Sequence, residues 1–565
     1  MTVPLAERGS GARQRHPGIG RAALTIGVIT VVARAVGFGR QVVFAHTVGT
    51  SCLGTAYTTA NMVPNIIYDI VLGGALSSVV VPVLARPVID GGADRAEGSA
   101  GLPREQVQQI AAALLTWTVV LLVPVSALLA VAARPIATTL LSGASGCPHG
   151  SLASVGTRML VVFAPQVLLY GLAVVLYGIL QAHRRFGAPA LAPLLSSLVV
   201  VGAYLGFGAI GGQYVNHLGA LPPLPEYLLS GGTTLGVLAL VGTAVVPAWR
   251  LRVSSRPRRA LRPTLRFPPG IGSRVRKLAL AGVLTLVAQD ASVAVVIVLA
   301  NRFGHSGALV LYGFAWAVFV VPFAVLAVPI ATSAFPELSA LTQGAGRQGP
   351  PSQFDMTAAG STRAVLLASM LGAAALAGAR MPLARVFESH SAPDAWVLAT
   401  SLAAFAPGLV GYGLSANLSR VLYALGRNRA PALAVSAGWL LVIVADAVIV
   451  PFIPKARVVP VLGLGTTIGL TAAGIALLVL VRRERGRAPL AGMWRAFGAG
   501  TVGCVLAAAA GSGVAQAVRV SGFFPNVGMS VLVSAVVSGV FGAVVVNLDG
   551  GDARAAIRRL RGSRV

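Results

Sequence analysis

The residues best placed to do chemistry in this sequence are charged side chains that interrupt long apolar stretches. Arg34 and Arg40 lie in the first stretch, with Gly37 and Gly39 between them. In a helix, a spacing of six residues puts the two guanidinium groups on nearby but not identical faces. Because a guanidinium pairs with phosphate oxygens through two hydrogen bonds, the pattern predicts a cationic wall that receives an anion. The alternative is that the arginine side chains snorkel, so that their guanidinium groups lie in the water at the membrane surface. This alternative fits Arg40 better than Arg34.

Three acids interrupt other apolar stretches. Asp69 is the nearest counter-charge for the two arginines, and a structural ion pair fits it as well as a role in transport. Asp290 and Asp446 lie in the second half of the chain, where Thr466 and Thr467 supply hydroxyl groups. Such oxygen ligands suit a cation or a proton relay, and the alternative is a pair of hydrogen-bonded acids that joins helices. We therefore expect no organic cofactor, and Na+ or H+ as the candidate coupling ion.

The composition excludes an ordinary soluble protein. Of the 565 residues, 56% are hydrophobic and 11% are charged, whereas soluble domains contain about 25% charged residues. The net charge of +28 comes from short basic runs between apolar stretches, which is typical of membrane topology rather than of a nucleic-acid-binding surface. The sequence shows no P-loop, zinc-type Cys/His spacing or hydrolytic triad, so it predicts a membrane protein that is not an enzyme.

Hydropathy predicts fourteen membrane spans, since each crossing needs roughly 20 apolar residues. Their approximate bounds are 22–46, 55–85, 106–133, 155–181, 189–211, 227–249, 277–301, 309–335, 360–379, 396–419, 431–453, 458–481, 492–518 and 524–547. With both termini in the cytoplasm, 34 of the 44 Lys and Arg residues fall in inner segments and 8 in outer loops. This asymmetry follows the positive-inside rule and favours a multi-pass membrane protein with an even number of spans. The many Arg and Ala residues, with Lys277 and Lys455 as the only two lysines, are typical of a GC-rich bacterial genome, so a bacterial cytoplasmic membrane is the expected location.

Two sequence matches indicate an internal duplication. The segment LYGILQAHRRFGAPALAP from Leu176 resembles LYALGRNRAPALAV from Leu422, and the turns that end at Tyr57 and Tyr312 also resemble each other. Both offsets correspond to six spans, so we predict an all-α fold of two parallel six-helix repeats with two extra C-terminal helices. The predicted parts are a basic tail (1–21), an N-lobe (22–249), a basic linker (250–276), a C-lobe (277–481), two further spans (490–547) and a second basic tail (548–565).

Cysteines and prolines add two expectations. We expect the three cysteines to be free thiols, although Cys52 and Cys147 fall in predicted outer loops, where an oxidising exterior permits a disulfide. Prolines inside membrane helices are tolerated where neighbours or cavity water satisfy the freed carbonyl groups, and they are expected to bend helices around a cavity. The prolines in question are Pro64, Pro124, Pro165, Pro322, Pro329 and Pro407.

Four motifs link the chain to a known family. They are RAVGFGR (Arg34–Arg40), MVPNIIYDIVLGGALSSVVVPVLA (Met62–Ala85), ILQAHRRFGAPALAP (Ile179–Pro193) and PFAVLAVPIATSAFPELS from Pro322. Through them the chain resembles the MviN/MurJ family of lipid II flippases, within the multidrug/oligosaccharidyl-lipid/polysaccharide exporter superfamily. The resemblance implies a V-shaped flippase that works by alternating access, with a cationic cavity for a pyrophosphate-linked head group. It also implies that the last two helices form a groove for the polyprenyl tail.

The resemblance implies a set of substrate-binding residues. Arg34 and Arg40 match the first-span arginines that face the cavity in the family. With Asp69, and with Asn65 of the PN motif, they form the predicted substrate-binding set. The implied partners are a polyprenyl-pyrophosphate lipid, with lipid II as the first candidate, the surrounding bilayer and proteins of cell-wall synthesis. No nucleic acid is expected.

The chain also departs from the family pattern. The acid expected early in span two aligns with Thr55, the arginine after the PN motif with Tyr68, and the span-eight arginine with Ala317. Some relatives bind sodium between spans seven, eleven and twelve, and Asp290 and Asp446 fall on the first two of these spans. The second lobe is therefore the predicted place for a coupling cation.

These observations leave several functions open. The first is a flippase that moves the peptidoglycan precursor lipid II from the inner to the outer leaflet. The missing charges favour, as alternatives, a flippase for another polyprenyl-linked glycan or a non-transporting scaffold of cell-wall synthesis. A cation-coupled drug antiporter of the same superfamily is a further alternative, but it needs only twelve spans and is expected to have an acid-lined first lobe.

Overall fold

The structure is a computed structural model, and it describes residues 17–70, 88–89, 102–182, 185, 187–254, 263–266, 271–342, 353–388, 395–518 and 520–548. These residues are almost entirely helical. The predicted N-terminal tail up to residue 16, the end of the second predicted span and the C-terminal tail from residue 549 lie outside the described residues.

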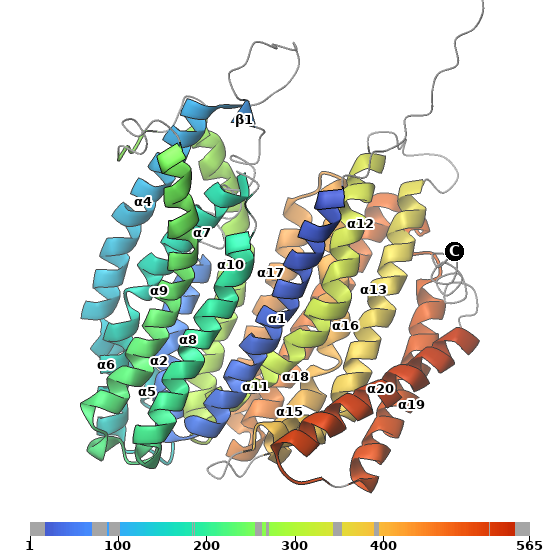
Figure 1. Cartoon of the computed structure of the whole chain (residues 1–565). Coiled ribbons are helices and arrows are strands. Elements are labelled where there is room, and N and C mark those ends of the chain that lie inside the picture. The colour runs from blue at the N-terminus through green and yellow to red at the C-terminus, as the bar shows by residue number, and fades with distance from the viewer. Residues whose placement is uncertain are drawn as a thin grey trace, which may run out of the picture.

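The first group of helices covers the predicted N-lobe, and α8 packs between α1 and α9 (Figure 1). A parallel pairing of two residues each joins β1 (Val88–Ile89) to β2 (Leu102–Pro103). The helices are α1 (Pro17–Thr47), α2 (Cys52–Tyr68), α4 (Arg104–Val131), α5 (Ala133–Leu141), α6 (His149–Phe163), α7 (Gln166–Ala182), α8 (Gly187–Gly211) and α9 (Pro223–Ser254), with the short turns η2 (Gly212–Tyr214) and η3 (Leu218–Ala220).

The second group follows the linker and covers the predicted C-lobe. Its helices are α10 (Ile271–Phe303), α11 (Ala308–Pro322), η4 (Phe323–Ala327), α12 (Val328–Leu341), α13 (Gln353–Gly378), α14 (Arg380–Val386), α15 (Ala395–Phe405), α16 (Gly408–Ala424), α17 (Arg429–Ile449), η5 (Val450–Phe452), η6 (Lys455–Arg457) and α18 (Val458–Arg485). After η7 (Ala488–Leu490), the last two helices, α19 (Met493–Ala517) and α20 (Phe523–Leu548), pack against each other and against α13. Figure 1 shows this last pair along the outside of the second group, and the start of α20 reaches α1, where the rings of Phe523 and His46 are 5.8 Å apart.

Among the described residues, eleven helices are long and apolar enough to cross a membrane, or twelve if the bent pair α15 and α16 counts as one span. These twelve correspond one by one to the last twelve predicted spans. The first two predicted spans fall on α1 and α2, which are not among them, and the second runs on into residues that are not described. The multi-span helical architecture is therefore confirmed, whereas the count of fourteen stays a prediction.

Prolines mark the places where three of these spans break. Pro165 stands between α6 and α7, and Pro407 stands at the 42° bend between α15 and α16. Pro322 ends α11, and the five residues that follow it form the π-helical turn η4 before α12 begins. A proline removes one backbone hydrogen bond and clashes with the preceding turn, so it favours such breaks. Pro64 and Pro124, by contrast, lie inside the continuous helices α2 and α4.

Small residues let α18 approach its neighbours closely. A side chain at Gly411 of α16 would collide with the backbone of Leu470, and one at Gly438 of α17 would collide with Ala473. In a membrane, where lipid tails are as apolar as the side chains, close backbone contact of this kind is a principal source of helix association. Asp446 is on α17 of this closely packed set, whereas Asp290 is on α10, which packs against α17.

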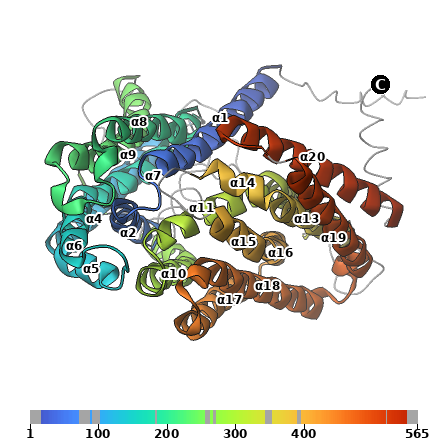
Figure 2. The same cartoon turned by 90° about the horizontal axis from the view of Figure 1, so that it is seen from below.

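The two groups of helices meet at one end of the molecule, which we call the closed end. It consists of the turns at residues 47–52, 142–148 and 303–308, which connect α1 to α2, α5 to α6 and α10 to α11. The view from below shows α2 and α11 side by side where the groups meet (Figure 2). Ser145 of the first group donates a hydrogen bond to the carbonyl of Gly304, at 3.0 Å, and bridges to His305.

Two further contacts join the groups at the closed end. Asn301 of α10 donates from its side-chain amide to the Thr59 hydroxyl, at 2.9 Å, and to the Leu140 carbonyl, at 3.0 Å. The backbone amide of Gly307 donates to the Thr55 hydroxyl at 2.8 Å. Gly307 has a φ of +81°, and a side chain there would collide with the neighbouring turn, so only glycine permits this approach. The His46 imidazole, near the end of α1, also forms a hydrogen bond with the Val386 carbonyl of the second group, at 3.0 Å.

A disulfide holds two turns of the closed end together, and the expectation of three free thiols was wrong. Cys52 at the start of α2 is bonded to Cys147 in the α5–α6 turn, with 5.7 Å between their Cα atoms. Both residues are buried, and Cys504 is the one free cysteine. The sequence could place both cysteines on one side of a membrane, but it could not show that the α5–α6 turn folds over the start of α2.

Replacing both bridged cysteines is expected to destabilise the protein. The Cys52→Ser/Cys147→Ser variant frees a 95-residue loop, and a disulfide of this type contributes about 2–4 kcal/mol. We expect a lower midpoint of thermal unfolding in detergent, and no comparable drop for the control Cys504→Ser. Equal midpoints for the double variant and the wild type would contradict the bridge.

Candidate functional site

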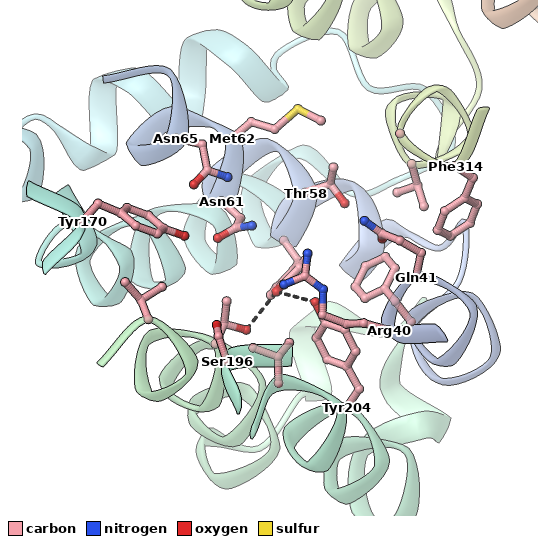
Figure 3. A pocket seen from close by; sticks show the side chains of 17 residues that line it. Arg40, Gln41, Thr58, Asn61, Met62, Asn65, Tyr170, Ser196, Tyr204 and Phe314 are labelled. Carbon is pink, nitrogen blue, oxygen red and sulfur yellow. Dashed lines mark hydrogen bonds between the residues drawn. The ribbon is translucent and has the colours of Figure 1, made fainter. Parts of the chain in front are cut away.

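A polar pocket opens among the helices of the first group. Its volume is about 210 Å³, and its walls come from α1, α2, α7, α8 and α9, with α11 of the second group closing one side. Figure 3 shows Arg40 of α1 at its centre, with Asn61 and Asn65 of α2 and Tyr170 of α7 around it. Among the described residues that line it, Arg40 is the sole charged group.

Helix geometry explains why α2 contributes several groups to this pocket. Thr58, Asn61 and Asn65 are three and four residues apart, so they lie on one face of the helix. The start of α2 is fixed by Ser51, whose hydroxyl accepts a hydrogen bond from the Gly54 amide at 3.0 Å. This N-cap satisfies a free amide of the first turn and fixes the residue at which α2 begins.

A buried hydrogen-bonded cluster supports the wall of the pocket next to Arg40. The Tyr57 hydroxyl is 2.8 Å from the Tyr204 hydroxyl and 2.8 Å from that of Thr233. Thr233 also donates to the Leu229 carbonyl one turn earlier, at 2.8 Å. These side chains satisfy one another, so they are rigid supports rather than free binding groups.

The pocket contains some of the predicted substrate-binding residues and not others. Arg40 and Asn65 both line it. Arg34 is exposed on another face of α1 and is not part of the lining. Asp69 is partly buried at the end of α2 and forms no ion pair with Arg34 or Arg40, so the interpretation of Asp69 as their structural partner was wrong. It lies instead within electrostatic range of Asp290 on α10.

The three departures from the family pattern have separate locations. Thr55 lies at the closed end, where its hydroxyl accepts a hydrogen bond from the Gly307 amide and donates one to the Ser51 carbonyl. Tyr68 packs against Tyr170, with 4.7 Å between ring centroids. Ala317 lies on α11, partly buried. Thr55 therefore has a structural task in joining the lobes, which its alignment with an acid did not indicate.

The acids of the second group lie apart from each other. Asp446 is in the last turn of α17, 1% exposed, and neither of its carboxylate oxygens has a hydrogen-bond partner among the described residues. Its carboxylate packs against Gly465 of α18 and beside Tyr312. Asp290 is buried near the middle of α10, with Oδ2 unpartnered.

The predicted cation-site residues are therefore only partly assembled. Thr467 donates its hydroxyl to the Ala404 carbonyl at 2.7 Å, which turns it toward α15. Thr466 is the threonine that lies on the Tyr312 side, near Asp446. No cluster of three or more His, Cys, Asp or Glu side chains suited to a metal occurs in the described part of the chain.

Sequence reasoning did not identify several pocket residues. Tyr57, Tyr170, Ser196, Tyr204 and Thr233 are single polar residues within strongly apolar helices. A hydroxyl in such a helix also bonds to its own backbone, as many serines and threonines do here, so the residue type alone carries little information. Only the packing of α7, α8 and α9 around α2 brings them together.

The fold and the pocket define a class of membrane transporter built from two helical bundles. Two solved structures share this fold with the chain. One is "Lipid II flippase MurJ, inward closed conformation", with a TM-score of 0.66, 17% identity, and coverage of 93% of this chain and 100% of that one. The other is an inward-facing multidrug resistance MATE family transporter of the MOP superfamily, with a TM-score of 0.60, 14% identity, and coverage of 81% and 98%.

Sequence comparison identifies the family. The model of the family described as "Lipid II flippase MurJ" matches residues 44–530, so the chain belongs to this family. A curated relative, the lipid II flippase MurJ of Burkholderia cenocepacia, is 26% identical over 495 residues, which cover 86% of this chain and 88% of the relative.

Packing at the Asp446 site can be tested with a glycine substitution. In Gly465→Ala, the new methyl group collides with the Asp446 carboxylate, and overpacking of this kind costs about 1–3 kcal/mol. We expect a lower thermal midpoint in detergent, and a smaller drop when Gly465→Ala is made in an Asp446→Ala background. Gly242→Ala is the control, because a side chain there meets open space. Equal effects in both backgrounds would show that Asp446 is not the neighbour.

Proposed function

We propose that this protein is a flippase that carries lipid II, the polyprenyl-pyrophosphate-linked precursor of peptidoglycan, from the inner to the outer leaflet of the cytoplasmic membrane. The observation that carries the proposal is the single guanidinium of Arg40 in a polar pocket enclosed by apolar helices. Membership of the lipid II flippase family supports the same substrate. A flippase must shield a charged head group from hydrocarbon, and a buried cationic pocket does so.

Arg40 and Asn65 are the proposed contacts for the pyrophosphate end of the head group. A guanidinium offers two parallel hydrogen bonds to phosphate oxygens, and the Asn65 amide supplies a neutral donor beside it. Arg34, exposed on another face of α1, is proposed to meet the head group as it moves between the lobes, with Asp69 at the inner end of α2. The polyprenyl tail is proposed to lie beside α19 and α20, which pack against α13 of the second group.

The closed end is the proposed outer gate. Its hydrogen bonds between the lobes must break for the head group to leave, and they re-form when the protein returns, which is the essence of alternating access. An outer position for the closed end agrees with the charge asymmetry, which favours both termini in the cytoplasm. A disulfide at the closed end agrees with an oxidising exterior.

The finer architecture belongs to the same proposal. We take α1 and α2 as the first two of fourteen spans. The two lobes are then parallel six-helix repeats that enclose a V-shaped cavity, and the last two helices stand outside the repeat. Proteins of cell-wall synthesis are the expected partners on the outer side, where the product is used.

Loss of the Arg40 charge is expected to abolish function. Arg40→Ala should fail to restore growth to a bacterium depleted of its own lipid II flippase, because the anion then enters the apolar region without a counter-charge. Arg40→Lys should restore growth in part, since lysine keeps the charge but loses the paired hydrogen bonds. Protein levels are compared by immunoblot, with the exposed Arg457→Ala as control. Full growth of Arg40→Ala, with outer-leaflet lipid II unchanged in an in-cell accessibility assay, would refute the proposal.

Asp446 is the proposed site of coupling to a cation gradient. A buried, ionised carboxylate without a partner costs several kcal/mol, so this side chain requires either a proton or a bound monovalent cation. Thr466 supplies the hydroxyl group on the Asp446 side, and Asp290 of α10 and Thr467 of α18 complete the proposed cation-binding set from a greater distance. No bound cofactor is needed beyond Na+ or H+.

Removing the Asp446 charge is expected to uncouple transport. Asp446→Asn keeps the shape of the side chain, so it should fold, but it can neither bind a cation nor exchange a proton. Outer-leaflet lipid II in cells that express the protein should respond to replacement of Na+ or to collapse of the proton gradient, and this response should vanish in Asp446→Asn. The exposed Glu388→Gln is the control. An identical response in wild type and Asp446→Asn would exclude the site.

A drug antiporter is the second candidate, and the similarity in fold to a MATE transporter favours it. The charge of the pocket argues against it, because Arg40 repels cationic drugs and no described lining residue is acidic. Drug-resistance profiles of a strain that lacks the protein distinguish the two functions.

A further inference from the structure

The pocket around Arg40 holds more hydrogen-bonding groups than a phosphate can use. The side chains of Asn61, Asn65, Tyr170 and Ser196 form no hydrogen bond with other described residues. Nor does that of Gln41, which also lines the pocket. Polar groups inside an apolar bundle are normally satisfied by protein or water, so a set of open groups around one space indicates a polar ligand.

We propose that this pocket is a carbohydrate subsite, which holds one sugar ring of the transported head group beside the phosphate at Arg40. The proposal rests on the flippase function and adds the part of the substrate that the first lobe recognises. Its key residues are Asn61 on α2, Tyr170 on α7 and Ser196 on α8. None of them carries a charge.

The charge balance favours a sugar ring with a phosphate at Arg40 over a whole pyrophosphate inside the pocket. A pyrophosphate carries several negative charges, whereas the described lining contains one cation. Sugar hydroxyl and acetamido groups, in contrast, both donate and accept hydrogen bonds. Asparagine, tyrosine and serine side chains also do both, so they match a sugar at several positions at once.

The arrangement of the side chains also suits a ring. In Figure 3, Asn61, Asn65 and Tyr170 approach the central space from one side, and Ser196 and Arg40 from another. The hydroxyl groups of the neighbouring Tyr57, Tyr204 and Thr233 are engaged in hydrogen bonds with one another. The side chains without such bonds are therefore the ones available to a ligand.

The size of the pocket limits what can enter. Its volume of about 210 Å³ is below the roughly 300–1,000 Å³ of pockets that enclose a drug-sized ligand. A single sugar ring with one phosphate oxygen fits this scale, and a disaccharide with its attached peptide does not. The rest of the head group must therefore lie outside the pocket, between the lobes.

A pair of tyrosine substitutions on one helix tests the proposal. Tyr170→Phe removes a hydroxyl that faces the pocket, whereas Tyr177→Phe removes one that bonds to Leu240 and Thr243 away from it. Binding of N-acetylglucosamine 1-phosphate and of inorganic pyrophosphate to the purified full-length protein in detergent is measured by calorimetry. Loss of one hydrogen bond is expected to weaken sugar-phosphate binding by about five- to tenfold in Tyr170→Phe. Tyr177→Phe should bind as the wild type does.

A second variant separates sugar from phosphate recognition. Asn61→Leu should weaken sugar-phosphate binding in the same way and leave pyrophosphate binding unchanged, while Arg40→Ala should weaken both. The sugar subsite is refuted if Asn61→Leu and Tyr170→Phe bind the sugar phosphate like Tyr177→Phe. It is also refuted if the wild type binds pyrophosphate as tightly as the sugar phosphate. A different result would refute the flippase function itself, namely full growth of cells that carry Arg40→Ala.

Discussion

The cost of leaving a polar group without a partner in apolar surroundings governs this structure. The backbone meets it by forming helices almost everywhere that the chain is described. Hydroxyl side chains meet it by donating to the carbonyl one turn earlier, as Thr118, Ser530 and Ser534 do. One buried cluster avoids this cost because the hydroxyl groups of Tyr57, Tyr204 and Thr233 form hydrogen bonds with one another. Buried polar atoms without a hydrogen-bond partner remain at several described positions, among them Asp290 and Asn417, but only at Asp446 do both oxygens of a buried carboxylate lack one.

The same constraint explains how the two helical groups are joined. Several contacts at the closed end pair a side chain of one group with a backbone or side-chain group of the other, as between Thr55 and Gly307 or between Asn301 and Thr59. Each such bond contributes modestly, about 1 kcal/mol net, because water or the other turns can replace the partner. A joint made of several weak bonds can open without unfolding either group. The disulfide, by contrast, lies within the first group and does not have to break when the groups separate.

The sequence predicts the elements of this fold better than the contacts between them. Hydropathy placed the last twelve spans, and the prolines at 165, 322 and 407 marked real breaks, because both signals are local. Arg40 and Asn65 were also found from local motifs. The pairing of Asp69 with the arginines was wrong, and the Cys52–Cys147 bridge was not expected, because each depends on how distant helices turn toward each other. Thr55 shows the limit most clearly, since its partner Gly307 is 252 residues away.

The pocket is built mainly by the first group of helices, but Val310, Gly313 and Phe314 of α11 belong to the second. Any movement that separates the groups at the closed end therefore removes one wall of the pocket. The affinity of a ligand in the pocket must then differ between the two conformations, and by thermodynamic linkage the ligand shifts the balance between them by the same free energy. A substrate that contacts α11 stabilises the conformation in which the closed end is sealed. Release of the substrate and opening of the closed end are therefore thermodynamically coupled.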